Sequence, residues 1–316
     1  MRKIILLAPL AVLLLQPGLA FGQAKVGTAG AQFLEIGVSA RAIGMGEAFL
    51  GVSDDASALY YNPGALSLLT QKEVVFTHVD YPAGIKYEFI GFVYPVPSLA
   101  GTIGAAFYAL HMGDMPVTGY DFADGNGQTF TARDYAIALT YSAGLTDRFS
   151  VGLTVKNITE LLAQYKATGW AMDLGTYYDT GYRNFKICMA ISNFGPDMAF
   201  ISEDYPLPID FRFGTAIDVV QSEKSRLTAA VQASHPNDNL EKYSVGLEYW
   251  FNDIFALRGG KKFNYDYYEE GDFGGGLTFG AGARFNFSAY RLNLDYAYQD
   301  LGYLDTVNRF SLGFRF

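Results

Sequence analysis

Few residues in the chain have the type and spacing needed for catalysis or metal binding. The three histidines, His78, His111 and His235, lie far apart, and none has a second ligand at the spacing of a metal site. The Gly-x-Ser-x-Gly motif of a hydrolase nucleophile elbow does not occur. A Ser–His pair assembled only by the fold is left open, but no motif favours one. We therefore predict a protein that is not an enzyme and needs no metal or cofactor.

A glycine-containing run at residues 44–49 begins like a dinucleotide-binding fingerprint, with Gly44 and Gly46 at the expected spacing. It lacks the third glycine, and no strand–helix–strand unit surrounds it. The net charge of -9 argues against a nucleic-acid partner. Cys188 is the only cysteine, so the chain forms no internal disulfide. The remaining candidates for function are charged residues that alternate with apolar ones.

The last strand-like run shows this alternation most clearly, with Phe310, Leu312 and Phe314 on one face and arginines on the other. In an outer-membrane barrel the apolar face meets lipid and the polar face lines the lumen. Because their signs are mixed, we predict that the lumenal charges hold a plug and do not line a conduction path. The charged residues in such positions are Asp210, Arg212, Asp218, Arg226, Glu248, Arg258, Arg284, Arg291, Asp295, Arg309 and Arg315.

The strands that position these charges fill the chain from residue 71 onward. About 14 strand-like runs can be marked, most of them close to the 9–11 residues that a tilted strand needs to cross a bilayer. Aromatic residues make up 16% of the chain, as the interfacial girdles of a barrel require. We predict an all-β transmembrane antiparallel barrel over residues 71–316; the alternative is a soluble all-β sandwich. The runs begin near Lys72, Ile85, Leu99, Phe130, Phe149, Lys166, Tyr182, Ile209, Arg226, Lys242, Ile254, Leu277, Ala289 and Asn308.

The connections between these runs alternate between short turns and longer loops. The longer ones are residues 112–129, 194–208, 263–276 and 301–306. Outer-membrane barrels have short periplasmic turns and long extracellular loops. An even number of strands then places both termini in the periplasm.

The N-terminus has the features of an export signal. Residues 1–22 begin with Arg2 and Lys3, continue with an apolar run, and end with small residues at the cleavage positions. The apolar run is shorter than the roughly 20 residues of a spanning helix. We expect a cleaved signal peptide and a mature protein in the outer membrane, in contact with its lipids.

Residues 23–70 lack amphipathic strands and are rich in small residues, so we predict an N-terminal plug in the lumen that contains short helices. Ser53, Asp54 and Asp55 can cap one of them. Small residues at lumenal strand positions leave room for such a plug. These are Gly104, Ala136, Ala138, Ala190, Gly214, Ala216, Gly246 and Gly313.

The runs at residues 31–37, 40–49 and 54–66 strongly resemble the opening of PorV/PorQ family proteins. That family belongs to a wider group similar to the FadL-type fatty acid transporters, which implies a 14-stranded barrel and an N-terminal plug ending in an Asn-Pro-Ala motif. Gly64 stands where the family usually has alanine. The residues that carry the motif are Arg41, Gly44, Met45, Gly46, Asp54, Asp55, Asn62 and Pro63.

The resemblance implies two alternative functions. PorV-like proteins act in the type IX secretion system, where they receive exported proteins through a C-terminal β-sandwich signal; PorQ-like proteins are related accessory members. Secreted cargo and other components of that system would then be the partners. FadL-like relatives are passive channels for hydrophobic small molecules, which would make the partner a hydrophobic ligand. A structural barrel with an unassigned partner is a third alternative.

Apolar and aromatic residues in two predicted outer loops are candidates for partner binding, because aromatic side chains anchor protein interfaces and an apolar loop can bind a partner or a lipid-like ligand. Phe200 and Ile201 lie in one loop and could equally fold over the barrel mouth. The second loop combines aromatic residues with acidic ones, and the alternative there is an ordinary interfacial belt. Its aromatic residues are Phe263, Tyr265, Tyr267 and Tyr268.

Overall fold

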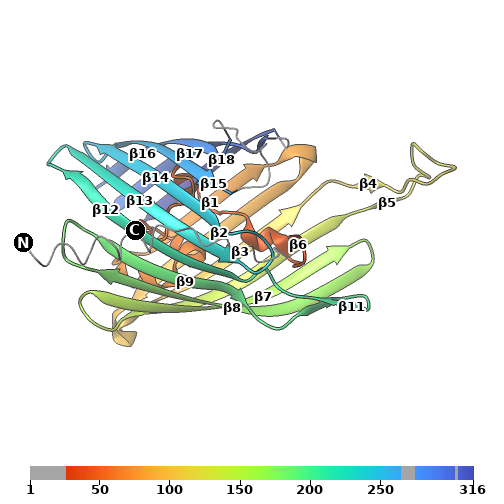
Figure 1. The fold of residues 1–316 in the computed structure, drawn as a ribbon, viewed down its shortest axis with the longest axis horizontal. Helices are drawn as coiled ribbons and strands as arrows, with labels where there is room; N and C mark the ends of the chain where they lie inside the picture. Colours follow the sequence, from red (N-terminus) through yellow and green to blue (C-terminus); the bar gives the residue numbers. More distant parts are fainter. Residues whose placement is uncertain (1–25, 265–274, 303–304) are drawn as a thin grey trace, which may run out of the picture.

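A computed structural model describes residues 26–264, 275–302 and 305–316 of the chain. Fourteen strands form one closed antiparallel barrel, in which the first strand pairs with the last (Figure 1). The predicted membrane barrel is therefore confirmed, and each predicted strand start lies within four residues of an observed one. The soluble sandwich is wrong, because the wall is a single closed sheet.

Each strand of the wall pairs with its neighbours in sequence, and two small hairpins extend from it at one end. The wall strands are β1 (Glu73–Asp80), β2 (Lys86–Val96), β3 (Gly101–His111), β6 (Ala132–Gly144), β7 (Phe149–Leu162), β8 (Tyr165–Asp179), β9 (Lys186–Phe194), β12 (Asp210–Gln221), β13 (Ser225–Pro236), β14 (Lys242–Phe251), β15 (Phe255–Phe263), β16 (Leu277–Phe287), β17 (Tyr290–Asp300) and β18 (Thr306–Arg315). The hairpins are β4 (Met115–Pro116) with β5 (Thr129–Phe130), and β10 (Met198–Phe200) with β11 (Glu203–Tyr205).

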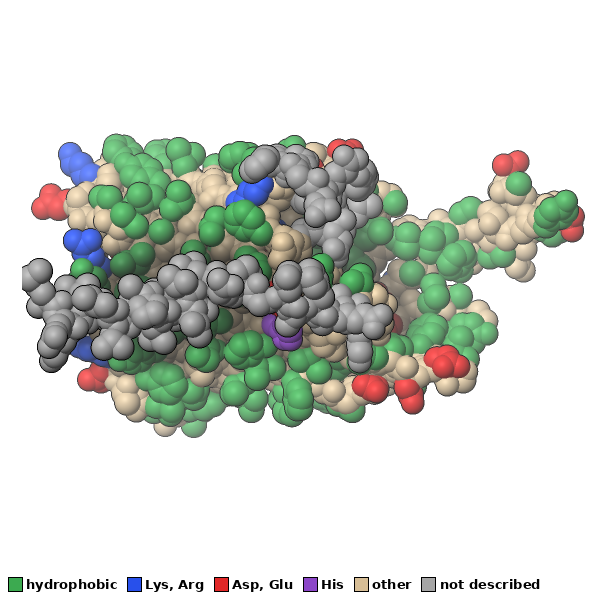
Figure 2. Space-filling view, viewed as in Figure 1, with side chains coloured by type: hydrophobic (Ala, Val, Ile, Leu, Met, Phe, Trp, Pro, Cys, Tyr) green, Lys and Arg blue, Asp and Glu red, His purple; other side chains and the backbone are tan. Residues whose placement is uncertain are grey.

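The outer face of the wall is apolar, as a lipid environment requires. On β14, Tyr243, Val245 and Leu247 keep 41–52% of their surface exposed. The alternate residues Ser244 and Glu248 turn inward and are buried. Figure 2 shows the resulting dense cover of hydrophobic side chains on one side of the barrel. The predicted direction of each strand face is confirmed.

The connections separate the barrel into a short-turn end and a long-loop end. Tight connections, such as residues 222–224 and 288–289, lie at the short-turn end, where β1 begins and β18 ends. The β4–β5 hairpin projects far from the wall at the opposite end (Figure 1). The turns at residues 163–164 and 81–85 also lie at the long-loop end and are short.

The lumen is filled by residues 26–70, which we call the plug. Its helical segments are η1 (Gln32–Glu35), α2 (Ala40–Gly44), α3 (Ala58–Tyr61) and η2 (Pro63–Leu68); η3 (Pro82–Gly84) and η4 (Pro97–Leu99) lie in turns of the wall. Nearly all plug residues from Val38 to Leu66 are buried. No helix within the described ranges is long and apolar enough to cross a membrane.

The plug enters from the end opposite to the one predicted. The backbone N–H of Gly27 donates to the carbonyl of Asp238, and that of Gly30 donates to Pro206; both acceptors belong to long loops. The described chain therefore starts at the long-loop end and reaches β1 at the short-turn end. An even number of strands places the start of β1 and the end of β18 at the same end of the barrel. It does not determine the path of a segment that precedes β1 and passes through the lumen.

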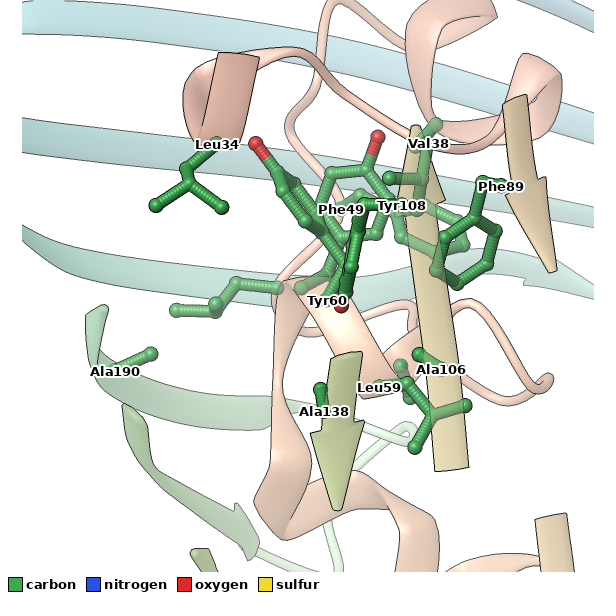
Figure 3. Packing of buried hydrophobic residues seen from close by; sticks show 14 of the residues in the cluster. Leu34, Val38, Phe49, Leu59, Tyr60, Phe89, Ala106, Tyr108, Ala138 and Ala190 are labelled. Atoms are coloured by element: carbon green, nitrogen blue, oxygen red, sulfur yellow. The ribbon is translucent and has the colours of Figure 1, made fainter. Parts of the chain in front are cut away.

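Aromatic side chains form the centre of the plug–wall contact (Figure 3). Phe49 packs edge-on against Tyr61 at 5.2 Å, and Tyr60 lies 6.3 Å from Tyr108 of the wall, measured between ring centroids. Leu59 packs near Ala106 and Ala138, two of the small wall residues (Figure 3). Burying one such large side chain contributes about 1.5–3 kcal/mol. The small lumenal residues therefore make space for the plug, as predicted.

Candidate functional site

Arg41 is the main ionic link between the plug and the wall. Ser39 caps α2 by accepting a hydrogen bond from the Ala42 N–H at 3.4 Å, which fixes the helix that carries Arg41. The guanidinium of Arg41 donates two hydrogen bonds to Glu248 of β14, at 2.7 and 2.8 Å. Arg258 of β15 donates to the same carboxylate at 2.8 Å. Glu248 therefore lies between two arginines, and each charge in this buried group has a partner.

The motif carboxylates complete the Arg41 group from the plug side. Arg41 donates to Asp55 at 2.9 Å and also binds Asp54. Burial opposes ionisation of Asp54, but the Arg41 charge outweighs it and lowers the pKa of Asp54 to about 2. The contacts with Asp54 and Asp55 hold the Arg41 guanidinium in place within the plug. The pair that links the plug to the wall, Arg41–Glu248, is buried on both sides, and removing one partner of such a pair costs about 3–5 kcal/mol.

Gly44 and Gly46 let α2 approach the wall closely. A Cβ atom on Gly44 would lie 2.9 Å from the Cα of Gly280, and one on Gly46 would lie 2.9 Å from the backbone nitrogen of Lys261. Gly46 also has a positive φ of 64°, and its N–H donates to the Thr278 hydroxyl at 2.9 Å. The glycine pattern therefore serves packing of the plug against the wall.

The Asn62–Pro63 pair forms the turn that leads out of the plug. The Asn62 side chain accepts from the Gly64 N–H at 3.1 Å and donates to the carbonyls of Leu50 and Thr176. A Cβ atom on Gly64 would lie 2.7 Å from the carbonyl oxygen of Gly175. An alanine here would require the wall backbone to shift, which explains the glycine at this position of this chain.

Other lumenal charges also contact the plug, as predicted for Arg212, Arg309 and Arg315, whereas Asp218, Arg284, Arg291 and Asp295 bond to residues of the wall and its turns. Arg315 donates to the Asp54 carbonyl at 3.0 Å and to Glu73. Arg212 donates to the Tyr60 carbonyl at 3.3 Å. The remaining plug contacts are Arg309 to the Gly37 carbonyl, Lys242 to Glu35 at 3.6 Å, and Lys262 to Glu47.

One buried ion pair in the wall escaped the sequence analysis. Lys156 of β7 lies 2.7 Å from Asp173 of β8, and both side chains are almost fully buried. The β8–β9 pairing shifts register at this point, and Asp173 accepts the Asn193 N–H at 2.7 Å in place of a ladder bond. In the sequence, the only indication of this pair is the alternation of β7, which directs Lys156 toward the lumen.

A cavity of about 500 Å³ opens at the long-loop end of the lumen. Its apolar lining comes from the plug and from neighbouring loops, and includes Phe33, Ile43 and Leu110. Its polar lining includes Glu47 and Glu35. Burial raises the pKa of Glu35 to about 7, and the nearby Lys242 offsets this only in part. The cavity is therefore lined by both apolar and charged side chains.

The candidate binding loops lie at the long-loop end. Ile201 is 68% exposed, whereas Phe200 is half-buried and packs against Tyr165 at 6.4 Å between ring centroids. Met198 is buried, so this loop folds partly over the mouth. Phe263 is exposed at the end of β15. The other predicted aromatic residues, Tyr265, Tyr267 and Tyr268, lie outside the described residues.

A more exposed aromatic site lies at the tip of the β4–β5 hairpin. Tyr120 is fully exposed and Phe122 is 55% exposed. Asp114, Asp121 and Asp124 lie beside them in sequence. The sequence analysis recognised this loop by its length but did not single out its aromatic residues. The hairpin extends beyond the rest of the molecule (Figure 2).

The histidines do not converge. His78 pairs with Glu88 at 2.7 Å on the outer face, and His235 pairs with Glu241 at 3.2 Å in a loop. In the described part of the chain, no three His, Cys, Asp or Glu side chains gather into a metal-binding group.

Comparison with solved structures defines the class of protein. The Ralstonia pickettii toluene transporter TbuX matches with a TM-score of 0.57 and 15% identity, over 89% of this chain and 98% of that one. The Pseudomonas putida toluene transporter TodX matches with a TM-score of 0.52 and 12% identity, over 82% and 92% of the two chains. This chain therefore shares the closed β-barrel fold of these two transporters.

The family follows from a second comparison. The model of the type IX secretion system protein PorV matches residues 20–236, more than two thirds of the chain. The chain belongs to the PorV family. A search of curated proteins gives no significant match.

Proposed function

We propose that this barrel handles exported proteins of a type IX secretion pathway by docking their C-terminal β-sandwich signal on its long-loop end. Family membership carries the proposal. The exposed side chains of Tyr120, Phe122 and Ile201 support it, because these two aromatic residues and one aliphatic residue lie at the long-loop end, where acidic residues are also found. The plug that fills the lumen supports a surface role over passage of a protein through the barrel.

The proposal includes an orientation and a division of the chain. Residues 1–22 act as a cleaved signal peptide, residues 23–70 form the plug, and residues 71–316 form the barrel. The long-loop end faces the cell exterior and the short-turn end faces the periplasm, as in other outer-membrane barrels. The motif from Arg41 to Pro63 anchors the plug, and the loops around Tyr120, Phe200 and Phe263 supply the docking surface.

The proposal can be tested by deleting the gene and comparing the surface and periplasmic proteomes with those of the parent strain. We expect proteins with uncleaved C-terminal signals to accumulate in the periplasm and to disappear from the surface. An unchanged surface proteome would contradict the proposal. Complementation with the Tyr182→Ser variant, altered at the short-turn end, should restore the surface proteins.

The long-loop cavity favours a second candidate function, passage of hydrophobic small molecules. Its volume of about 500 Å³ and its apolar lining fit a small ligand. A channel of this kind would need a kinked strand that opens the wall beside the plug. Against this candidate, β3, whose Leu110 lines the cavity, keeps a continuous register with both neighbouring strands. Liposomes that carry the purified protein and take up a hydrophobic probe faster than empty liposomes would support this function.

A further inference from the structure

A polar cavity of about 230 Å³ lies at the short-turn end of the lumen, apart from the proposed docking loops. Four strands and the plug each contribute an arginine to its lining. These arginines are Arg41, Arg226, Arg284, Arg291 and Arg315. Such a concentration of guanidinium groups in one cavity requires negative charge nearby, so the next question is which of them have partners.

Three of the five arginines are paired with carboxylates of the protein. Arg41 is held by the motif aspartates and Glu248, as described above. Arg284 and Arg315 each bind one acidic residue, at 2.5 and 2.6 Å. The carboxylates concerned are Asp54, Asp55 and Glu248 for Arg41, Asp253 for Arg284, and Glu73 for Arg315.

Arg226 and Arg291 lack such compensation within the described residues. The Nε of Arg226 is buried and has no hydrogen-bond partner there. Arg291 donates only to the amide oxygen of Asn286, at 2.9 Å. Arg291 also lies directly opposite Arg315 in the β17–β18 pairing, an arrangement in which like charges destabilise the sheet. Arg226 and Arg291 therefore have no direct carboxylate partner among the described residues, although Asp54, Asp55 and Asp253 also line the cavity.

We propose that this cavity binds a phosphate group, either as free inorganic phosphate or as a phosphate monoester. A phosphate carries about -1.5 to -2 charges at neutral pH, and the two arginines without a carboxylate partner would donate hydrogen bonds to its oxygen atoms. The planar guanidinium fork of arginine suits the oxygen atoms of phosphate. Arginine-lined constrictions also confer selectivity for phosphate in other pores.

The fluorescence of Trp250 can report binding of an anion in this cavity. Trp250 is the cross-strand neighbour of Arg226, and its ring lies 4.0 Å beneath the guanidinium of Arg284. The only other tryptophan, Trp170, lies on the exposed outer face. The Trp170→Phe variant therefore isolates the fluorescence of Trp250, which should change when an anion enters the cavity.

The experiment is a titration of the purified Trp170→Phe barrel in detergent with sodium phosphate, at ionic strength held constant with sodium chloride. We expect a saturable change in fluorescence, and a matching binding isotherm by calorimetry. Arg226→Gln and Arg291→Gln should each weaken phosphate binding about tenfold or more, because each removes a charge-assisted contact. Arg148→Gln removes an exposed arginine at the same end, outside the cavity, and should leave the affinity unchanged.

Two controls make the result decisive. Heat-modifiable gel mobility identifies which variants are folded, and the calorimetric comparison uses only those. A response that is not saturable, that chloride reproduces, or that Arg148→Gln weakens as much as the cavity variants would overturn the proposal. A parallel titration with glycerol 3-phosphate distinguishes the sources, since equal affinity indicates a site for the free ion and tighter binding indicates a site for phosphate esters.

Discussion

The two ends of the lumen differ in what fills them. At the short-turn end, Arg41 joins the plug to Glu248 of the wall through a buried ion pair. At the long-loop end, a cavity of about 500 Å³ separates the plug from the surrounding loops, and aromatic side chains such as Tyr120 are exposed. In the view of Figure 2, Lys and Arg side chains gather at the short-turn end and Asp and Glu at the tips of the loops.

This difference supports the proposal that one end of the barrel holds the plug and the other end binds partners. The short-turn half has the buried ion pairs around Arg41 and Glu248, which hold the plug in a single arrangement. The long-loop half has the exposed aromatic groups and open volume that binding requires. The four predictions below test this division, from the largest expected effect to the smallest.

The largest effect is expected from Arg41→Met. The substitution preserves much of the side-chain volume but removes a buried charge partner from both Asp55 and Glu248. The free energy of unfolding should fall by about 3–5 kcal/mol, because buried charges lose compensation. Denaturant titration of the purified barrel measures this, with the exposed Arg148→Met as control. Equal losses in the two variants would show that the ion pairs do not anchor the plug.

A smaller loss is expected from Gly44→Ala. The added methyl group would lie 2.9 Å from the Cα of Gly280, so the plug or the wall must move. Overpacking of this kind costs about 1–3 kcal/mol. Gly259→Ala is a matched control on β15, since a Cβ atom there would meet no heavy atom within 4 Å. If Gly259→Ala destabilises the barrel as much as Gly44→Ala, close packing of α2 is not the reason for the glycine.

The third effect concerns the long-loop end and is a pH dependence. The pKa of Glu35 is raised from 4.5 to about 7, so the folded plug binds this proton more tightly than the opened one. The stabilisation is complete below about pH 4.5 and is lost as the pH rises through about 7. Hydrogen exchange of η1, corrected for intrinsic rates, should report easier opening over this range. In Glu35→Gln this pH dependence should disappear, and its persistence would assign the titration to another group.

Much of the fold and part of the site could be predicted from the sequence. Alternation placed the strands and their lumenal charges because the two faces of each strand meet different surroundings. The resemblance placed the glycine and asparagine motif in the plug, but its contacts with the wall came only from the structure. The Lys156–Asp173 pair and the entry of the plug at the long-loop end could not be predicted. Both depend on which distant segments meet in space, and alternation within one strand does not determine this.

The smallest effect on stability is expected from substitutions at the tip of the β4–β5 hairpin. These substitutions also give the most direct test of docking. The measurement is the affinity of the detergent-purified barrel for an isolated C-terminal β-sandwich signal domain from a type IX exported protein. We predict that Tyr120→Ser with Phe122→Ser weakens binding about tenfold or more without lowering stability, because exposed aromatic anchors dominate such interfaces. Tyr182→Ser, which removes an exposed aromatic residue at the short-turn end, should bind normally. Equal affinity of the hairpin variant and the wild type would contradict docking at the hairpin, and failure of the wild-type barrel to bind the signal domain would contradict the account as a whole.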